Sequence, residues 1–296
     1  MNYRTLIEAG VHFGHQKTRW CPLMKPYIWG LKSGIHLIDV SKTLQALEEA
    51  GKFLEQIAAE GKQVLFVGTK PAAQKIIEEA AIRAKAPFIS YRWVGGLLTN
   101  HSQVKKSLVK MLNYEEVLEK AEDFRYTKKE LNSYKKIAEK LNKSLKGIRE
   151  LSWPVGAVVL VDAKKENTAL KEAIQSEVPV VALVDTNTDP SGVDFVIPGN
   201  DDSPKSISLI VDYLATFVER GKAASVAKAK KAKEDAEAKK AAAKKEVKAS
   251  DEHKIAAKSV VKTEVKVAEV PKKEVAKTVT KVEEKAEKVE AAVEKA

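Results

Sequence analysis

The feature that most restricts the fold of this chain is a pair of short segments that are apolar at every position, Ala157–Val161 and Val180–Val184. A strand with one solvated face alternates apolar and polar residues, whereas a strand buried on both faces does not. Valine dominates both segments, and its branched side chain favours strands. The two segments therefore predict strands buried on both faces, as in a parallel sheet covered by helices.

Further strand and helix patterns alternate along the chain on either side of these segments. This alternation implies right-handed crossovers and a three-layer α/β/α fold. A short β-hairpin is also predicted, from Tyr27–Trp29 and Ile35–Ile38 around Lys32-Ser33-Gly34. The other predicted strands are Val64–Val67, Phe88–Tyr91 and Phe195–Ile197, and the predicted helices are Thr43–Glu60, Ala72–Lys85, Asn167–Ser176 and Pro204–Glu219.

A long helical insertion at about residues 103–150 interrupts this rhythm. Its apolar residues step by three and four, which is the seam of a coiled coil. Thr127 followed by Glu130 is a capping-box pattern for a second helix, so we expect an antiparallel coiled-coil hairpin that turns near Phe124–Thr127. The seam residues are Val104, Leu108, Met111 and Leu118, with Glu115 interrupting, and then Leu131, Tyr134, Ala138, Leu141, Leu145 and Ile148.

The last quarter of the chain has a different composition. Lys, Ala, Glu and Val dominate residues 222–296, and no Phe, Trp or Tyr occurs there. Such a segment buries too little apolar surface to offset its chain entropy, so we expect it to be largely disordered. Residues 1–221 are then one α/β domain that carries the hairpin.

The charge is distributed unevenly. Met1–Glu150 holds 26 Lys and Arg against 16 Asp and Glu, whereas Leu151–Arg220 holds 5 against 11. The remaining 21 basic and 14 acidic residues lie in Gly221–Ala296. A basic half joined to an acidic half suggests one face turned towards a polyanion. For the tail, we expect a weak, non-specific attraction to RNA.

Several protein classes are excluded by the sequence. Cys21 is the single cysteine, which excludes an internal disulfide framework and fits a reducing compartment. No run of 18 apolar residues could span a membrane, and the first residues lack a signal-peptide pattern. The cytoplasm is therefore the expected location.

Three loops carry residues that resemble catalytic or ligand-binding sites. Gly68-Thr69-Lys70 stands between a strand and a helix but lacks a complete phosphate-binding motif, so we interpret it as an ordinary junction. Asp185, Asp189 and Asp194 follow a strand among turn-forming residues, and a turn is the better interpretation. Gly199–Pro204 is interpreted as a loop and helix cap. No catalytic residue and no cofactor is predicted.

Histidines near the N-terminus raise the question of a metal. His12, His15 and Cys21 follow an H-x-x-H-x5-C spacing, and His36 lies beyond them. This spacing matches no closed set of four zinc ligands. No metal site is predicted, and whether a metal binds near His12 and His15 stays open.

Two loops instead have the composition of RNA-contacting segments. In Gly10–Trp20, aromatic, histidine and basic residues alternate with glycines that allow close backbone approach, and Tyr91–Asn100 repeats this mixture. Three alternatives remain. Gly10–Trp20 could be buried for structural reasons, Trp93 could be a core residue, and the hairpin lysines could simply be solvated. The predicted RNA contacts are His12, His15, Lys17, Arg19, Trp20, Lys25, Arg92, Asn100, Lys105 and Lys106.

These loops and two later segments resemble the bacterial-type small-subunit ribosomal protein two family. The resemblance covers roughly Tyr3–Arg220 in one collinear order. The matching segments are Ala9–His15 with Met24-Lys25-Pro26, Leu65–Lys70, Arg92–Asn100, Val184–Pro190 and Val193–Asp202.

The resemblance implies a flavodoxin-like parallel sheet with a protruding coiled-coil hairpin and no enzymatic activity. It also implies binding to small-subunit ribosomal RNA on the solvent side of the subunit, near the head–body junction. Neighbouring small-subunit proteins are implied partners, including protein one, which this family helps to recruit. The connection Arg149–Val155 is shorter than the family's Gly-rich version, and the tail lies beyond the matching region.

Two other function classes remain as alternatives. A small α/β enzyme or nucleotide switch would require a phosphate loop or paired catalytic groups at the strand ends, and the sequence offers neither. A free-standing DNA-binding protein would bind duplex DNA and structured RNA with comparable affinity.

Overall fold

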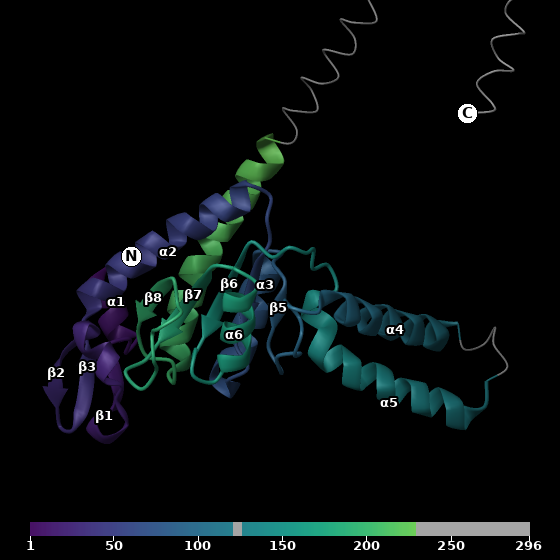
Figure 1. The fold of residues 1–296 in the computed structure, drawn as a ribbon, viewed down its shortest axis with the longest axis horizontal. Helices are drawn as coiled ribbons and strands as arrows, with labels where there is room; N and C mark the ends of the chain where they lie inside the picture. Colours follow the sequence, from purple (N-terminus) through teal and green to yellow (C-terminus); the bar gives the residue numbers. More distant parts are fainter. Residues whose placement is uncertain (121–125, 229–296) are drawn as a thin grey trace, which may run out of the picture. The chain divides into compact units, whose positions relative to one another are not determined.

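The centre of the protein is a five-stranded parallel sheet with the strand order β5-β4-β6-β7-β8 (Figure 1). The computed structural model describes residues 1–120 and 126–228. Numbered along the chain from β4, this order is 2-1-3-4-5, which is the flavodoxin-like arrangement. The predicted fold class is therefore confirmed. The strands are β4 (Val64–Val67), β5 (Phe88–Ile89), β6 (Ala157–Val161), β7 (Val180–Val184) and β8 (Phe195–Pro198).

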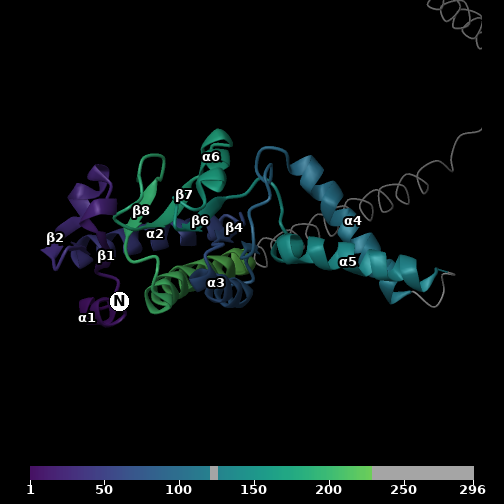
Figure 2. The same cartoon turned by 90° about the horizontal axis from the view of Figure 1, so that it is seen from below.

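Helices cover both faces of this sheet, as the continuous apolar strands predict. On one face lie α2 (Val40–Ala59), α3 (Pro71–Arg83) and the helix of residues 204–228, and on the other lies α6 (Asn167–Gln175) (Figure 2). Successive residues of a strand point to opposite faces, so each strand supplies both cores.

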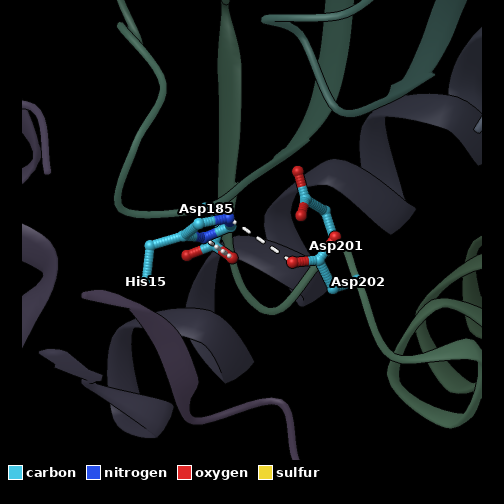
Figure 3. A group of neighbouring side chains, drawn as sticks. All are labelled: His15, Asp185, Asp201 and Asp202. Atoms are coloured by element: carbon cyan, nitrogen blue, oxygen red, sulfur yellow. Dashed lines mark hydrogen bonds and ion pairs between the residues drawn. The ribbon is translucent and has the colours of Figure 1, made fainter. Parts of the chain in front are cut away.

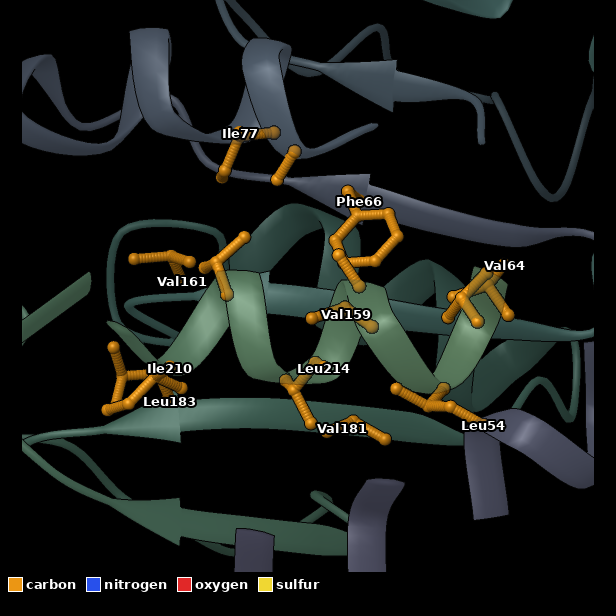
Figure 4. Packing of buried hydrophobic residues seen from close by; sticks show 14 of the residues in the cluster. Leu54, Val64, Phe66, Ile77, Val159, Val161, Val181, Leu183, Ile210 and Leu214 are labelled. Carbon is orange, nitrogen blue, oxygen red and sulfur yellow. The ribbon is translucent and has the colours of Figure 1, made fainter. Parts of the chain in front are cut away.

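The core between the sheet and the first group of helices is shown in Figure 4. Phe66 of β4 and Val159 of β6 meet Leu54 of α2 and Leu214 of the last helix in one buried cluster. The next residue along β6, Val158, lies on the opposite face of the sheet, where it belongs to a second buried cluster. Each such side chain contributes about 1.5 to 3 kcal/mol by leaving water, so the sheet is a stable base for the loops at its edge.

A small antiparallel sheet precedes the parallel one. It has the order β1-β3-β2, with β1 at Phe13–Gln16, β2 at Ile28–Lys32 and β3 at Ile35–Ile38. Ser33 and Gly34 both have positive φ angles, as a tight two-residue hairpin turn requires. The predicted hairpin is confirmed, whereas β1 was not predicted. The remaining short helices are α1 (Tyr3–Glu8), η1 (Lys17–Arg19) and η2 (Pro22–Tyr27).

The predicted helical hairpin is present as α4 (His101–Glu119) and α5 (Lys128–Leu145), followed by η3 (Lys146–Ile148). The reciprocal capping box of Thr127 and Glu130 starts α5. Glu115, the polar interruption of the seam, forms an ion pair of 2.5 Å with Arg149. Residues 121–125, where the turn was expected, lie outside the described part of the chain.

Several boundaries differ from the sequence-based prediction for local reasons. Helix α2 begins three residues before Thr43, because the Asp39 side chain accepts a hydrogen bond from Ser41 N and caps the helix. The final helix continues to residue 228, past the expected start of the tail at residue 222. Lys222, the first residue of the expected tail, is held against the folded domain, because its Nζ donates to Lys85 O, just after α3, over 2.7 Å. The rest of the predicted tail, residues 229–296, lies outside the described residues.

Within residues 1–120 and 126–228, no helix combines the length and the apolar character needed to cross a membrane.

Candidate functional site

The N-terminal segment is held against the carboxyl edge of the parallel sheet, where the strands end. His15 N donates to Thr186 Oγ1 over 2.8 Å, and Cys21 N donates to Thr186 O over 2.7 Å. Gly14 makes this approach possible, because a Cβ atom there would lie 2.6 Å from Thr186 Cγ2. At the end of β8, Asn200 Nδ2 donates to Gly10 O.

The His15 side chain lies in a group of carboxylates that come from two strand ends (Figure 3). Its Nδ1 is 2.8 Å from Asp185 Oδ2, and its Nε2 is 3.1 Å from Asn187 Nδ2 and 3.4 Å from Asp202 Oδ2. The hydrogen bond to Asp185 raises the pKa of His15 above its ordinary value, although partial burial opposes the shift. Asp185 is therefore not only a turn residue, because it binds a side chain 170 positions away.

Lys70 joins this group from the loop after β4. Its Nζ is 2.8 Å from Asp201 Oδ1, 2.5 Å from Asp202 Oδ1 and 3.6 Å from Asp162 Oδ2. Burial acts to lower the pKa of Lys70, but the hydrogen bonds to Asp201 and Asp202 outweigh burial and raise it. Asp201 is completely buried, and burial together with repulsion from Asp162 raises its pKa to about 7.

The place where a flavodoxin-like fold accepts a phosphate is filled by a protein carboxylate. Ligands of such folds bind where the strand order reverses, which here is between the ends of β4 and β6. The buried Glu166, after β6, accepts hydrogen bonds from Thr69 N (2.9 Å) and Thr69 Oγ1 (2.5 Å). An anionic ligand would have to displace Glu166, so the interpretation of Gly68-Thr69-Lys70 as a plain junction agrees with the geometry.

A second buried carboxylate shapes the loop after β5. Glu172 of α6 accepts from Trp93 Nε1 (2.9 Å), Gly96 N (2.9 Å) and Leu98 N (3.2 Å). The Trp93 ring is part of the core, with 8% of its surface exposed. Trp93 is therefore a core residue, which was the alternative to an RNA contact. The Glu172 side chain fixes the loop in one conformation.

The N-terminal members of the predicted contact set divide by exposure. Lys17, Arg19 and Lys25 are exposed. Half-buried Trp20 packs on His36 with ring centroids 5.1 Å apart. The remaining two members, His12 and His15, are half-buried as well, and burial lowers the pKa of His12.

The other four members lie near β5 and the start of α4. Arg92, Asn100, Lys105 and Lys106 are exposed. Asn100 precedes α4 and accepts from Ser102 Oγ over 3.1 Å. The Lys105 ammonium lies 4.9 Å from the centre of the Trp153 ring. This ring contact positions the ammonium but does not neutralise its charge.

The structure does not bring these two groups together. The first lies beside the ends of β7 and β8, and the second follows β5, the opposite edge strand (Figure 1). The loops after β5, β7 and β8 all leave the carboxyl edge of this sheet, since its strands run in parallel. Lys105 lies further back, over Trp153, whose neighbour Ser152 donates to Gln63 ahead of β4. The internally paired acidic residues of β6, β7 and β8 lie between them.

Sequence reasoning missed Glu166, Glu172 and the partners of Lys70. Their partners are 74 to 132 positions away, so no local spacing reveals them. One signal was present: Glu172 interrupts the apolar face of α6 between Ala169 and Ala173.

A comparison with known protein families agrees with this fold. The family model described as ribosomal protein S2 matches residues 6–221, which is more than half of the chain. The matched range contains the parallel sheet, the hairpin and the loops described above. The chain therefore belongs to the ribosomal protein S2 family, and it is a structural protein of the small ribosomal subunit rather than an enzyme.

Proposed function

We propose that this protein binds small-subunit ribosomal RNA through two groups of basic residues, one beside the ends of β7 and β8 and one in the loop after β5 and the start of α4. One observation carries the proposal: three acidic residues at the carboxyl edge of the sheet contact cations inside the protein, whereas the basic residues of both groups face solvent. Asp185, Asp201 and Asp202 contact His15 or Lys70. The exposed cations are Lys17, Arg19, Lys25, Arg92, Lys105 and Lys106.

The hairpin extends the basic surface away from the sheet. Its lysines lie on the exposed face, opposite the seam that joins the two helices. Phosphates of a folded RNA would pair with these charges, and the rigid loops would set the register. The exposed lysines within α4 and α5 are Lys105, Lys106, Lys110, Lys128, Lys129, Lys135, Lys136, Lys140 and Lys143.

This mode of binding has a measurable salt dependence. Neutralising phosphates releases counterions, so five to eight phosphate contacts give a slope of roughly −4 to −7 for log affinity against log salt. Shape complementarity to one RNA junction supplies specificity, with Trp20 and Arg92 available to stack on or reach base edges. His12, His15 and Asn100 remain predicted contacts of the same surface.

The proposal is tested by sedimentation of the purified chain with small subunits that lack it, across a series of salt concentrations. We expect stoichiometric binding at low salt and a slope in the range above. Equal affinity for duplex DNA of matched length would contradict it, because a fitted RNA contour would then add nothing to charge attraction.

The division of the chain is part of the proposal. Residues 1–221 form the RNA-binding domain, which acts bound to the ribosome in the cytoplasm. The basic tail from residue 222 adds only weak, non-specific attraction to RNA. Removal of residues 229–296 should lower affinity for the subunit at low salt and should leave it nearly unchanged at high salt.

We further propose that the protein helps to recruit small-subunit protein one, and one surface feature supports this. An open groove of about 640 Å³ lies beside α2 and β8 and is lined in part by Leu23, Tyr27, Val193 and Phe195. Leu23 is 54% exposed there. Apolar side chains around a groove, rimmed by polar residues, are typical of protein contacts.

A substitution in this groove tests the recruitment. We expect Leu23→Asp to lower retention of protein one on reconstituted subunits by about tenfold or more. The matched control is Leu31→Asp, because Leu31 is similarly exposed but lies outside the groove. Equal effects of the two variants would place the contact elsewhere.

A further inference from the structure

A small aromatic stack lies at the surface where α4 leaves the sheet domain (Figure 1). The ring of His101, the first residue of α4, lies against the ring of Trp153, with ring centroids 6.0 Å apart and an angle of 27° between the planes. These values are in the range of offset-stacked aromatic pairs. His101 is exposed and Trp153 is half-buried, so one face of the imidazole packs on the indole and the other face meets solvent.

Trp153 is held in place from behind. Its Nε1 donates to Leu97 O over 3.0 Å, and its ring packs against the second buried cluster. The amides on either side of Leu97, those of Gly96 and Leu98, both donate to Glu172. The indole is therefore a rigid backing for the imidazole, and binding of a flat ligand at this place costs little side-chain entropy.

A cation without an ion pair lies beside the stack. Lys105 is one helical turn after His101 on α4, and its Nζ lies 4.9 Å from the centre of the Trp153 ring. Within residues 1–120 and 126–228, this ammonium has no ion-pair partner. An aromatic ring attracts a cation but does not neutralise it, so the ammonium remains free to meet a phosphate.

Hydrogen-bonding groups at the stack are unused as well. In the described part of the chain, neither ring nitrogen of His101 has a hydrogen-bond partner. The neighbouring Asn100 uses its Oδ1, which accepts from Ser102 Oγ over 3.1 Å, and its Nδ2 stays available. An imidazole and a side-chain amide can both form hydrogen bonds with the edge of a nucleobase.

We propose that an unpaired base of small-subunit ribosomal RNA stacks on the solvent face of His101, with its phosphate beside Lys105 and its edge within reach of Asn100. Proteins that bind single-stranded RNA combine cations for the backbone with aromatic rings for the bases. This contact rests on the RNA binding proposed above, and it adds His101 and Trp153, which were not among the predicted contacts.

A nucleotide suits this surface better than a peptide. The stack offers one flat ring face with a cation next to it, and a nucleotide carries an aromatic base and a phosphate in one unit. A peptide would supply the same two features only through an aromatic and an acidic residue in the right order. An aliphatic side chain on the ring would leave Lys105 without a partner.

The first experiment compares His101→Leu with the wild type in titrations of the full-length protein into small subunits that lack it, over a series of salt concentrations. Leucine still covers Trp153 but has no aromatic face. We expect a loss of about 10-fold in affinity with an unchanged salt slope, because a stacked base is lost but no phosphate contact is. His101→Phe restores a ring and should bind within about twofold of the wild type.

Two further variants separate stacking from charge and from general surface effects. Asn113→Leu places the same side chain at an exposed position further along α4 and should bind like the wild type. Lys105→Ala should reduce the salt slope by about 1. A wild type that binds without salt dependence would contradict RNA binding as a whole. Salt-dependent wild-type binding with equal affinities of His101→Leu and Asn113→Leu would overturn the stacking contact alone.

Ultraviolet crosslinking of the wild-type complex gives a second readout that does not depend on the folding of a variant. Irradiation should join a nucleotide of the ribosomal RNA to the peptide that contains His101, identified by mass spectrometry after nuclease and protease digestion. If His101→Leu lost affinity but this peptide carried no nucleotide, the stack would contact a neighbouring protein, and the proposal would be overturned.

Discussion

Buried carboxylates at the carboxyl edge of the sheet each satisfy hydrogen-bond donors of a distant loop. Glu166 binds the loop after β4, and Glu172 binds the loop after β5. Backbone donors in such loops have no strand partner, and leaving them unpaired costs about 1 to 3 kcal/mol each. At the residue scale, therefore, Glu172 fixes the loop that carries Arg92 and Asn100, and Glu166 fixes the loop that carries Lys70.

A first prediction concerns Glu172. Replacement by alanine leaves Trp93 Nε1, Gly96 N and Leu98 N without their acceptor, so we expect a loss of about 3 kcal/mol or more in the free energy of unfolding. Urea denaturation measures this loss. The control Glu79→Ala removes an exposed carboxylate and should stay within about 0.5 kcal/mol; equal losses would refute the clamp.

A second prediction concerns Gly14, where β1 meets Thr186. In Gly14→Ala, the new Cβ would lie 2.6 Å from Thr186 Cγ2 and 3.1 Å from His36 O, which should cost about 1 to 3 kcal/mol. Gly30 in β2 has open space around its Cβ position. Gly30→Ala should therefore be neutral or slightly stabilising, and thermal melts of both variants separate steric crowding from strand propensity.

At the element scale, the regular parts of the fold could be predicted because their signals are local. The bounds of β6 and β7 coincide with continuous apolar runs in which every residue is buried. Strand β1 could not be predicted, because a glycine and two polar residues give Phe-Gly-His-Gln a weak strand signal. It pairs with β3, with Phe13 opposite Leu37 and Gln16 opposite Ile35. The candidate site divides likewise: its exposed cations are visible in sequence, and its buried ion pairs are not.

The cluster of His15, Asp185, Asp201 and Asp202 shows the same limit. Sequence reasoning sought ligands at short spacing and found only His12, His15, Cys21 and His36, which form no closed set. The carboxylates that surround His15 are contributed by turns after β7 and β8. In the sequence, those turns are indistinguishable from ordinary loops and caps, and part of that interpretation is correct, since Asp189 Oδ1 accepts from Ser191 N.

A third prediction concerns the start of α5. Thr127→Ala removes the side chain that accepts from Glu130 N, so the first turn of α5 should lose about 1 kcal/mol. Amide hydrogen exchange at Lys128–Leu131 should accelerate by about fivefold, because this energy sets the local opening equilibrium. Ser133→Ala, further along the exposed face of α5, should leave these rates unchanged.

At the scale of the whole molecule, the parallel sheet separates two basic surfaces by a centre in which acidic residues hold Lys70 and His15. Lys70 is neutralised by Asp201 and Asp202, so it is not available to a polyanion. The cations at the two ends remain available, and the sheet holds them at a fixed separation. A folded RNA that contacts both basic groups would bind more specifically than an RNA that contacts only one of them.

If these exposed cations attach the protein to ribosomal RNA, reversing their charge must weaken its binding to the small subunit. The variant Lys17→Glu/Arg19→Glu changes the N-terminal group, and Lys52→Glu/Lys75→Glu makes the same kind of change on exposed residues of α2 and α3. Both proteins would be titrated into small subunits that lack this protein, at several salt concentrations.

We expect the Lys17→Glu/Arg19→Glu variant to lose affinity by about 100-fold at low salt, with a salt slope reduced by about 2, because two phosphate contacts are removed. The Lys52→Glu/Lys75→Glu variant should bind like the wild type. Unchanged incorporation of the first variant, or equal losses for both, would contradict the claim.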